Sequence, residues 1–230
     1  MPAPISVIIP AKDAEGELPG CLSALIAGVE AGLVREVIVS SVPSNETKTR
    51  QIAEDAGAIW IEGNEGRGTQ MKRGAEAARG DWLLFVHADT WLSAQWPESV
   101  RKHISASPAK AGAFQLTFRS TVRRARIVEG LTNWRARTFG LPYGDQGLLI
   151  SRKLYNEVGG FDAVPLMEDV MIARRIGKKR LVELPAHAAT SGDKQARDGW
   201  FLRSLRNLWL LMRFRLGATP EALAKAYYRK

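Results

Sequence analysis

One stretch of the sequence decides the fold: Trp82-Leu83-Leu84-Phe85-Val86-His87-Ala88-Asp89-Thr90. Its first five residues form a continuous apolar run, which is typical of a strand buried on both faces of a sheet. Similar short runs lie at 5–9, 37–39 and 58–61, and helical patterns separate them at 18–31, 46–56 and 69–78. Strands that alternate with helices predict an α/β fold with a doubly wound, mainly parallel central sheet flanked by helices. Ligands of such sheets bind beyond the carboxyl ends of the strands, which gathers residues 10–13, 40–45, 62–68 and 87–90 around one crevice.

The chain after residue 90 is less regular. We expect strands at 113–118 and 148–150, helices at 126–138 and 200–216, and a loop that passes into a helix within 166–175. Pro220 suits the first position of a last helix that is capped by Thr219. No repeat, low-complexity tract or linker divides the chain, so residues 1–230 are predicted to form one domain that ends in amphipathic helices.

The composition is that of an ordinary folded protein with an excess of positive charge. The chain has 33 Lys and Arg against 24 Asp and Glu, a formal net charge of +9, which attracts anions such as nucleic acid, phosphorylated metabolites or acidic lipid. The single cysteine, Cys21, excludes an intrachain disulfide and a cysteine-based zinc site. No apolar run is long enough for a signal peptide or a membrane span, so we expect a cytosolic protein.

His87 and Asp89 follow the decisive strand and are separated by one residue. In extended backbone their side chains would point the same way, because strand side chains repeat with period two. An imidazole and a carboxylate could then hold a hard divalent cation together with substrate phosphates. The alternative is an aspartate that only caps a following helix.

Glu168 and Asp169 form an acidic pair between apolar neighbours, in Pro165-Leu166-Met167-Glu168-Asp169-Val170. Apolar surroundings raise the pKa of a carboxyl group towards the working pH, which favours a general base. Favourable negative charge at a helix N-terminus is the alternative.

Two segments rich in glycine complete the candidates. Residues 140–147, which include Tyr143, Asp145 and Gln146, have the composition of a ligand-facing loop, although a simple turn is also compatible. Residues 66–74 form a basic turn that enters a helix, and helix N-termini with Arg or Lys nearby bind phosphates. This turn is not a P-loop, because the Gly-Lys-Ser/Thr ending is missing.

Several of these motifs occur in a fixed order: Ser6-Val7-Ile8-Ile9-Pro10, His87-Ala88-Asp89, Gly159-Gly160-Phe161 and Glu168-Asp169. In kind and order they resemble the family 2 glycosyltransferases of the GT-A fold. A narrower resemblance, to the bacterial arsenosugar-biosynthesis-type and carotenoid-acid glycosyltransferases, rests on Gly66-Arg67-Gly68-Thr69-Gln70-Met71, His87-Ala88-Asp89-Thr90, Tyr143-Gly144-Asp145-Gln146-Gly147 and Met167-Glu168-Asp169-Val170. The similarity extends from Ile5 to about Tyr228.

The resemblance implies an inverting transfer of a sugar from a nucleotide-diphosphate sugar, expected to be a UDP-sugar, to a hydroxyl or carboxyl group of a small or lipid-like acceptor. It implies Mg²⁺ or Mn²⁺ held by Asp89, a general base at Asp169, and Glu168 orienting that base or the acceptor. Donor contacts fall on Pro10, Asp13, Ser40, Gly66, Arg67, Gln70, His87 and Ala88, and acceptor or loop contacts on Tyr143, Asp145 and Gln146. Residues 1–90 would bind the nucleotide sugar, 91–195 would hold the acceptor and the catalytic residues, and 196–230 would form the C-terminal helices.

The sequence departs from the family pattern at three places. His87 stands where the D-x-D motif has its first aspartate, which the narrower subgroup tolerates, and Asp13 is followed by Ala14 where the family usually has Asn-Glu. The carboxylate expected after the second strand is missing from Val39-Ser40-Ser41-Val42-Pro43-Ser44-Asn45. Donor binding would then be weaker, altered in base preference, or lost. The first alternative is a nucleotidyltransferase of related fold, although the glycine-rich basic loop it needs after the first strand is absent. The second is a catalytically silent member that binds a nucleotide or another partner.

Residues 200–213 predict a basic amphipathic helix with Arg203, Arg206 and Arg213 on one side. We expect this helix to pack on the sheet and to leave a solvated face. The alternative is a helix that lies on an anionic membrane surface, at the inner face of the cell membrane, and supplies a lipid-like acceptor. No RNA-recognition motif is present, so nucleic acid is not an expected partner.

Overall fold

The computed structural model describes residues 3–43 and 47–228, so Ser44, Asn45 and Glu46 of the predicted loop and helix lie outside the described residues. The first half alternates strands and helices as the apolar runs predict. Its elements are β1 (Ile5–Pro10), α1 (Leu18–Glu30), β2 (Val34–Ser41), α2 (Thr47–Asp55), β3 (Ile59–Glu62), α3 (Arg67–Ala77) and β4 (Trp82–Phe85).

The second half contains the predicted elements and several that the sequence patterns did not show. The predicted ones are β6 (Ala111–Phe118), α5 (Arg123–Phe139), β7 (Leu148–Ser151), α7 (Glu168–Ile176), α9 (Trp200–Arg215) and α10 (Pro220–Tyr228). The others are β5 (Thr90–Leu92), α4 (Trp96–Ala106), η1 (Gly144–Gln146), α6 (Arg152–Glu157), η2 (Lys178–Arg180), β8 (Leu181–Thr190) and α8 (Asp193–Asp198). The predicted cap of α10 is present, since the Ala222 amide donates to Thr219 Oγ1 at 3.3 Å.

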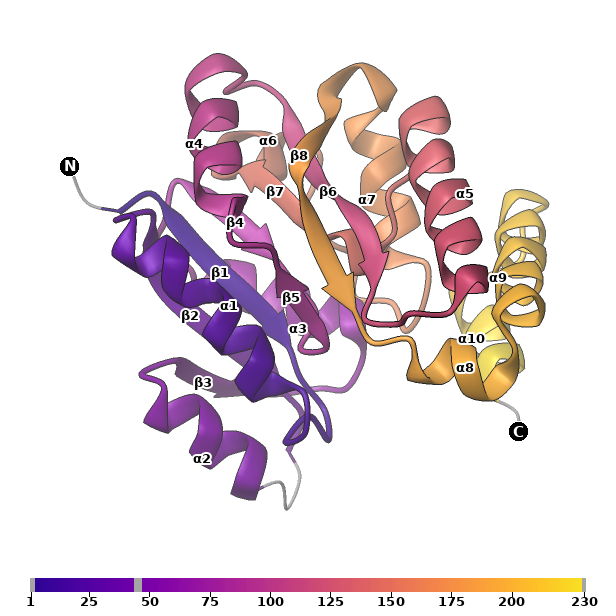
Figure 1. Cartoon of the computed structure of the whole chain (residues 1–230), viewed down its shortest axis with the longest axis horizontal. Helices are drawn as coiled ribbons and strands as arrows, with labels where there is room; N and C mark the ends of the chain where they lie inside the picture. Colours follow the sequence, from indigo (N-terminus) through magenta and orange to yellow (C-terminus); the bar gives the residue numbers. More distant parts are fainter. Residues whose placement is uncertain (1–2, 44–46, 229–230) are drawn as a thin grey trace.

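The described strands form one sheet in the order β3-β2-β1-β4-β7-β6-β8-β5 (Figure 1). Strands β1 to β4 are parallel neighbours, as are β6 and β8. Strand β7 runs antiparallel to β4 and β6, and β5 runs antiparallel to β8. The predicted α/β fold with a mainly parallel sheet is therefore confirmed. The chain moves outward from β1 through β2 to β3 and then returns to β4 on the other side of β1, which makes a topological switch point between β1 and β4.

Apolar layers cover both faces of the sheet, as the continuous apolar runs predict. Ile5, Val7 and Ile9 of β1 join a cluster with residues of α1 and α4, whereas Ile8 joins a second cluster with residues of α3, α6 and α7. The alternation follows from the period-two geometry of a strand.

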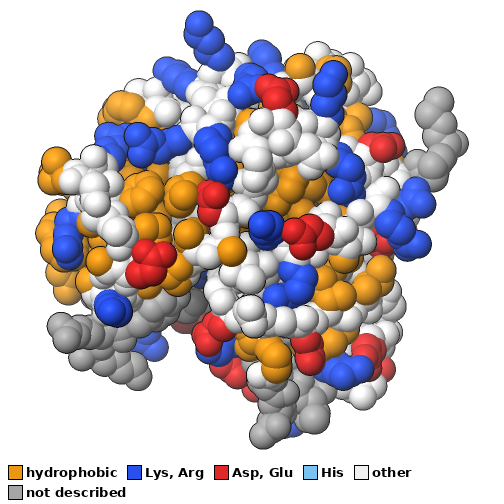
Figure 2. Space-filling view, turned by 180° about the vertical axis from the view of Figure 1, so that it is seen from behind, with side chains coloured by type: hydrophobic (Ala, Val, Ile, Leu, Met, Phe, Trp, Pro, Cys, Tyr) orange, Lys and Arg blue, Asp and Glu red, His pale blue; other side chains and the backbone are white. Residues whose placement is uncertain are grey.

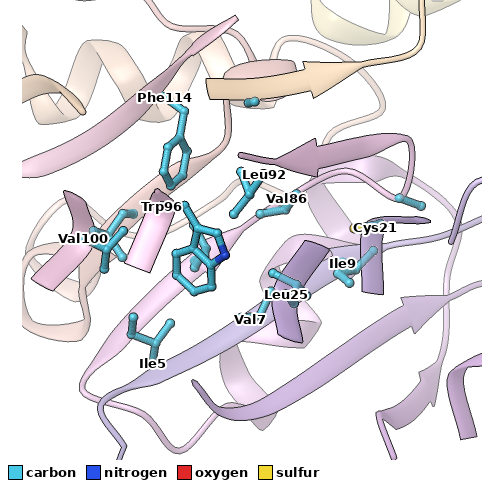
Figure 3. Packing of buried hydrophobic residues seen from close by; sticks show 14 of the residues in the cluster. Ile5, Val7, Ile9, Cys21, Leu25, Val86, Leu92, Trp96, Val100 and Phe114 are labelled. Atoms are coloured by element: carbon cyan, nitrogen blue, oxygen red, sulfur yellow. The ribbon is translucent and has the colours of Figure 1, made fainter. Parts of the chain in front are cut away.

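Trp96, at the start of α4, is fully buried in the first layer (Figure 3). Its Nε1 donates to the carbonyl oxygen of Ala24 in α1 at 3.1 Å. Gly28 makes room for the ring, because a Cβ at that position would lie 2.0 Å from it. The close approach of α1 and α4 holds this face of the sheet together.

The C-terminal helices lie differently from the expectation. Helix α9 packs beside α5, α8 and α10 instead of lying across the sheet. It meets the end of β6 through Trp200, whose ring centroid is 5.0 Å from that of Phe118. Leu210, with Leu223 of α10, packs against Met167 at the start of α7. Within the described ranges, no helix combines the length and the apolar character needed to cross a bilayer.

Candidate active site

A cavity of about 610 Å³ opens at the switch point between β1 and β4. Its walls come from the loop after β1, the start of α3, the turn after β4 and the segment after β8. It brings together most of the predicted donor residues and the predicted metal ligand: Pro10, Asp13, Gly66, Arg67, Gln70, His87, Ala88 and Asp89. Glu17, Glu65, Ser191 and Asp193 also line it and were not predicted.

The loop after β1 is held in place from behind by Gln70. This buried side chain donates from Nε2 to the carbonyl oxygens of Ala11 and Ser40, both at 2.8 Å. The Ala11 amide donates to the same Ser40 oxygen at 3.0 Å. Gln70 therefore ties the ends of β1 and β2 to α3 and also reaches the cavity wall.

The start of α3 is built so that its backbone can approach other segments closely. Gly66 has φ +128°, a conformation that side chains oppose, and a Cβ at Gly68 would lie 2.2 Å from the carbonyl oxygen of Asp162. Arg67 projects between these glycines and is about half exposed, with Nη1 3.8 Å from Glu168 Oε1. An arginine at the N-terminus of an 11-residue helix is a suitable place for phosphate oxygens.

The segment His87-Ala88-Asp89 is a turn, not the extended backbone that the sequence analysis assumed. Strand β4 ends at Phe85, and the Thr90 amide donates to the His87 carbonyl oxygen at 3.0 Å to close the turn before β5. The argument from strand periodicity for the two side chains was therefore wrong, because the chain reverses where the strand ends. Both residues nevertheless line the same two cavities.

The backbone of Asp89 is fixed by groups far away in the sequence. Its carbonyl oxygen accepts from the Ser191 amide at 3.2 Å and from Arg119 Nη2 at 3.4 Å. Arg119 is itself held by Glu17 Oε2 at 2.5 Å and lies 3.8 Å above the centre of the Trp91 ring. The turn is thus locked between α1, β5 and β8.

A second cavity, of about 160 Å³, adjoins the first and shares Arg67, His87, Asp89 and Ser191 with it. Both carboxylates of the predicted catalytic pair line it, as do two of the predicted loop residues, Tyr143 and Asp145. The shared residues mark the place where two ligands, one in each cavity, would meet.

Glu168 and Asp169 begin α7 behind Met167, whose φ of 70° is left-handed. Glu168 is buried, with 2 % of its surface exposed. Burial, and secondly the adjacent Asp169 carboxylate, raise the pKa of Glu168 to about 7, while Arg67 acts in the opposite direction. Asp169 is half-buried, and its Oδ2 accepts from the Gly144 amide at 2.9 Å. The two neighbours therefore differ sharply in solvation.

The 140–147 loop supplies the opposite wall, and its three predicted residues have different roles. Tyr143 lines the smaller cavity beneath the Arg135 guanidinium, which lies 3.3 Å from the ring centre. Burial raises the pKa of Asp145 to about 6, and its Oδ1 is enclosed without a hydrogen-bond partner among the described residues. Gln146 does not line this cavity; its Nε2 donates to the Phe114 carbonyl oxygen at 3.1 Å and holds the loop on β6.

The C-terminal segments complete the smaller cavity with residues that no motif indicated: Gln195, Arg203, Asn207, Leu210 and Tyr227. Arg203 is largely buried and donates to Asp198 Oδ2 at 2.6 Å and to Tyr227 Oη at 2.7 Å. The sequence shows that Arg203 and Asn207 are four residues apart and therefore lie on the same side of a helix. It does not show that α9 packs against α7, which is the contact that brings Arg203 to the cavity.

Ser40 is the predicted donor residue that the cavity does not include. Its side chain is fully buried, and its hydroxyl oxygen has no hydrogen-bond partner among the described residues. The position that would carry a carboxylate in the family pattern thus offers no group to either cavity.

The implied divalent cation has a modest but suitable set of protein ligands. Among the described residues, no group of three His, Cys, Asp or Glu side chains could hold a metal ion. Asp89 and His87 are together at the junction of the cavities, beside Arg67. Mg²⁺ is commonly held by one or two carboxylates together with substrate phosphates, so one carboxylate that lines a cavity with room for a diphosphate fits such an ion.

The chain matches the profile of "Glycosyl transferase family 2" over residues 6–159. No curated protein matches it in sequence. Among solved structures, S. aureus TarS 1–349 is similar with a TM-score of 0.60 at 14% identity, covering 82% of this chain and 60% of that one. TarS with UDP-GlcNAc bound matches with a TM-score of 0.60 at 17% identity, covering 81% and 58%.

Glucosyl-3-phosphoglycerate synthase (GpgS) from Mycobacterium tuberculosis, crystallised with Mg²⁺ and UDP, matches with a TM-score of 0.56 at 19% identity, covering 82% of this chain and 69% of that one. The chain spans about 60% of the length of the TarS structure. At these sequence identities, the similarity to solved structures establishes only the fold. The family follows from the profile match, because that match covers more than half of the chain. The narrower arsenosugar or carotenoid-acid subgroup is untested and stays a prediction. The chain belongs to glycosyl transferase family 2.

Proposed function

We propose that this protein is an inverting glycosyltransferase that moves a sugar from a nucleotide-diphosphate sugar to a hydroxyl or carboxyl group of an acceptor. The observation that carries the proposal is the junction of the two cavities at Arg67, His87 and Asp89, with the Glu168-Asp169 pair on the smaller side. A donor in the larger cavity would present its anomeric carbon at this junction. An acceptor in the smaller cavity would then approach from the side opposite the diphosphate, which is the geometry of inversion.

Asp89 is the proposed protein ligand of a divalent cation, with His87 beside it and Arg67 facing the same diphosphate. The GpgS structures that contain UDP together with Mg²⁺ or Mn²⁺, and the TarS structure with UDP-GlcNAc, support a UDP-sugar and such an ion. When bound, the cation would offset the charge that develops on the departing diphosphate. Arg67 contributes to the same effect from the N-terminus of α3.

Asp169 is the proposed general base. It lines the smaller cavity, and the amide of Gly144 fixes one carboxylate oxygen. The adjacent Glu168 is enclosed and close to Arg67, which suits it to orient the acceptor or its neighbour. For nucleoside contacts we propose the loop after β1, with Asp13, because Asp13 lines the larger cavity and the buried Ser40 does not.

The test of this function is an Asp169→Asn variant. Asparagine keeps the size of the side chain but has one acceptor oxygen, so it can accept from only one of the Gly144 and Val170 amides. The protein should still fold, with a slightly lower melting temperature, and should lose UDP release from UDP-sugars in the presence of Mn²⁺. Asp81→Asn, on a solvent-exposed aspartate outside both cavities, is the matched control and should retain full turnover. Full turnover in Asp169→Asn would refute the base assignment.

A thermal-shift screen separates the alternatives. Stabilisation by UDP that depends on Mn²⁺ supports the glycosyltransferase, whereas preference for a nucleoside triphosphate supports a nucleotidyltransferase. No stabilisation by any nucleotide would favour a silent member, which the buried Ser40 leaves as the second candidate.

A further inference from the structure

An extended apolar surface lies on α5 and α9, away from both cavities. We call it the α5–α9 surface. Its side chains are about half exposed or more: Ile127, Leu131, Trp134 and Phe139 on α5, and Phe201, Leu202, Leu205, Leu208, Trp209 and Met212 on α9. Figure 2 shows hydrophobic side chains gathered on the left of the molecule, the side where these helices lie when the view of Figure 1 is turned. An exposed apolar area of this extent marks an interaction site in a folded protein.

The exposed apolar residues repeat with helical spacing, so they form stripes. On α9, Leu202, Leu205, Trp209 and Met212 follow one another at intervals of three or four residues. The two helices lie side by side, so their stripes form a continuous area. The solvent side of α9 is therefore apolar, where the sequence analysis expected a solvated face.

The exposed charged residues of these two helices are arginines: Arg123, Arg124, Arg126, Arg137, Arg206 and Arg215. Of these, Arg137 lies 3.7 Å from Glu183 of β8. Helix α9 contains no acidic residue, and the acidic residue of α5, Glu129, is buried and paired with Arg126 at 2.7 Å. The α5–α9 surface therefore presents apolar side chains with a positive rim and no exposed carboxylate among the described residues of these helices.

We propose that the α5–α9 surface docks on an anionic membrane surface. A second copy of the chain would bring two surfaces of the same positive charge against each other, which like charges oppose. Anionic lipid headgroups complement the arginines, and the acyl boundary accepts the apolar stripes. Trp134 and Trp209 suit this depth, because an indole ring combines an apolar body with a polar N–H group.

The opposite side of the same helix connects this surface to the site. Arg203, Asn207 and Leu210 of α9 line the smaller cavity. A helix is about 10–12 Å across with its side chains, so a docked membrane would lie about one helix diameter from the proposed acceptor position. On the condition that the proposed glycosyl transfer holds, the acceptor is then an amphiphile of that membrane with a hydroxyl or carboxyl headgroup.

The experiment is co-sedimentation of the full chain with vesicles of phosphatidylcholine, with and without phosphatidylglycerol. Binding should require phosphatidylglycerol and weaken with salt. Arg123→Gln combined with Arg124→Gln should lower partitioning by about 25-fold, since each basic side chain near an anionic surface contributes about fivefold. Arg35→Gln combined with Lys153→Gln, on exposed residues of other elements, removes the same charge and should change little.

The apolar contribution needs a second pair. Leu202→Gln with Leu205→Gln should reduce partitioning by about tenfold or more, whereas Ile26→Gln with Val29→Gln, on comparably exposed residues of α1, should not. Absence of binding to anionic vesicles would overturn the proposal. If vesicle binding is absent and light scattering shows a dimer that the Leu202 and Leu205 substitutions dissociate, the surface is an interface between two copies of the chain. Calorimetric binding of UDP with Mn²⁺ is measured on the same variants and should not change, so failure of membrane docking and failure of the proposed function are told apart.

Discussion

Replacing Glu168 by glutamine should stabilise the protein above neutral pH and leave its stability at acidic pH nearly unchanged. The reason is the burial of this carboxyl group at the start of α7, where 2 % of its surface is exposed. Glutamine has the same shape and no charge to desolvate. Its effect therefore isolates what ionisation of Glu168 costs the folded state.

The magnitude follows from the pKa. Burial raises the pKa of Glu168 from its ordinary value of 4.5 to about 7. The folded protein therefore binds more protons than the unfolded chain between these values, and its stability falls as the pH rises through this window. At about 1.4 kcal/mol for each pH unit, the difference sets an upper limit of about 3 kcal/mol. The attraction of Arg67 is already contained in this pKa.

Urea denaturation of wild type and Glu168→Gln at pH 5 and pH 8 measures the effect. The free energy of unfolding of the variant should exceed that of wild type at pH 8 by up to about 3 kcal/mol, and the two should be close at pH 5. Glu221→Gln, on an exposed carboxylate of α10, controls for the loss of one negative charge. If Glu168→Gln is less stable than wild type at pH 8 but not at pH 5, the carboxylate is stabilised in its ionised form and the reasoning fails.

Three further outcomes are expected. Asp89→Ala should abolish the Mn²⁺-dependent part of UDP binding in calorimetric titration, and an unchanged titration would remove Asp89 from the metal site. Gly68→Ala should lower stability by about 1–3 kcal/mol, because the new Cβ would lie 2.2 Å from the Asp162 carbonyl oxygen; Gly130→Ala, in open space on α5, should not destabilise and is the control. Gln70→Leu should cost about 1–3 kcal/mol in urea denaturation, because the buried Ala11 carbonyl oxygen loses its side-chain donor, while the Ser40 oxygen keeps the Ala11 amide.

The elements that the sequence predicted are those whose pattern is local. Strands β1 and β4 are continuous apolar runs with neighbouring helices, and each was found within one residue of its expected bounds, whereas β2 contains the expected run 37–39 but extends from Val34 to Ser41. Strand β5 has three residues and exists through its pairing with β8. Strand β8 contains Pro185, which is unfavourable in a strand; it lies where the register with β6 shifts between Phe114 and Gln115, so the ladder skips the missing amide donor. Only the folded pairing reveals either strand.

The candidate site divides in the same way. Composition alone identifies three parts of the site: the acidic pair, His87 and Asp89 after the strand, and the turn before α3. Each is polar or rich in glycine and lies next to an apolar run. Their mutual geometry could not be predicted, as the turn at residues 87–90 shows. Arg203 and Tyr227 were missed because they reach the smaller cavity through the packing of α9 and α10 on α7, and nothing in their local sequence records that contact.

Backbone strain supports a working site over a silent relative. Among the described residues, positive φ at a residue other than glycine occurs at Asp13, with 49°, and Met167, with 70°. Each such conformation costs about 1 kcal/mol or more. A glycine at either position would adopt the same backbone conformation without this cost. Asp13 lines the larger cavity, and Met167 lines the smaller one and directs Glu168 into it. Both strained residues and the buried carboxyl group thus line the two cavities. Proteins commonly sacrifice stability at functional sites, so this coincidence is expected of a working site.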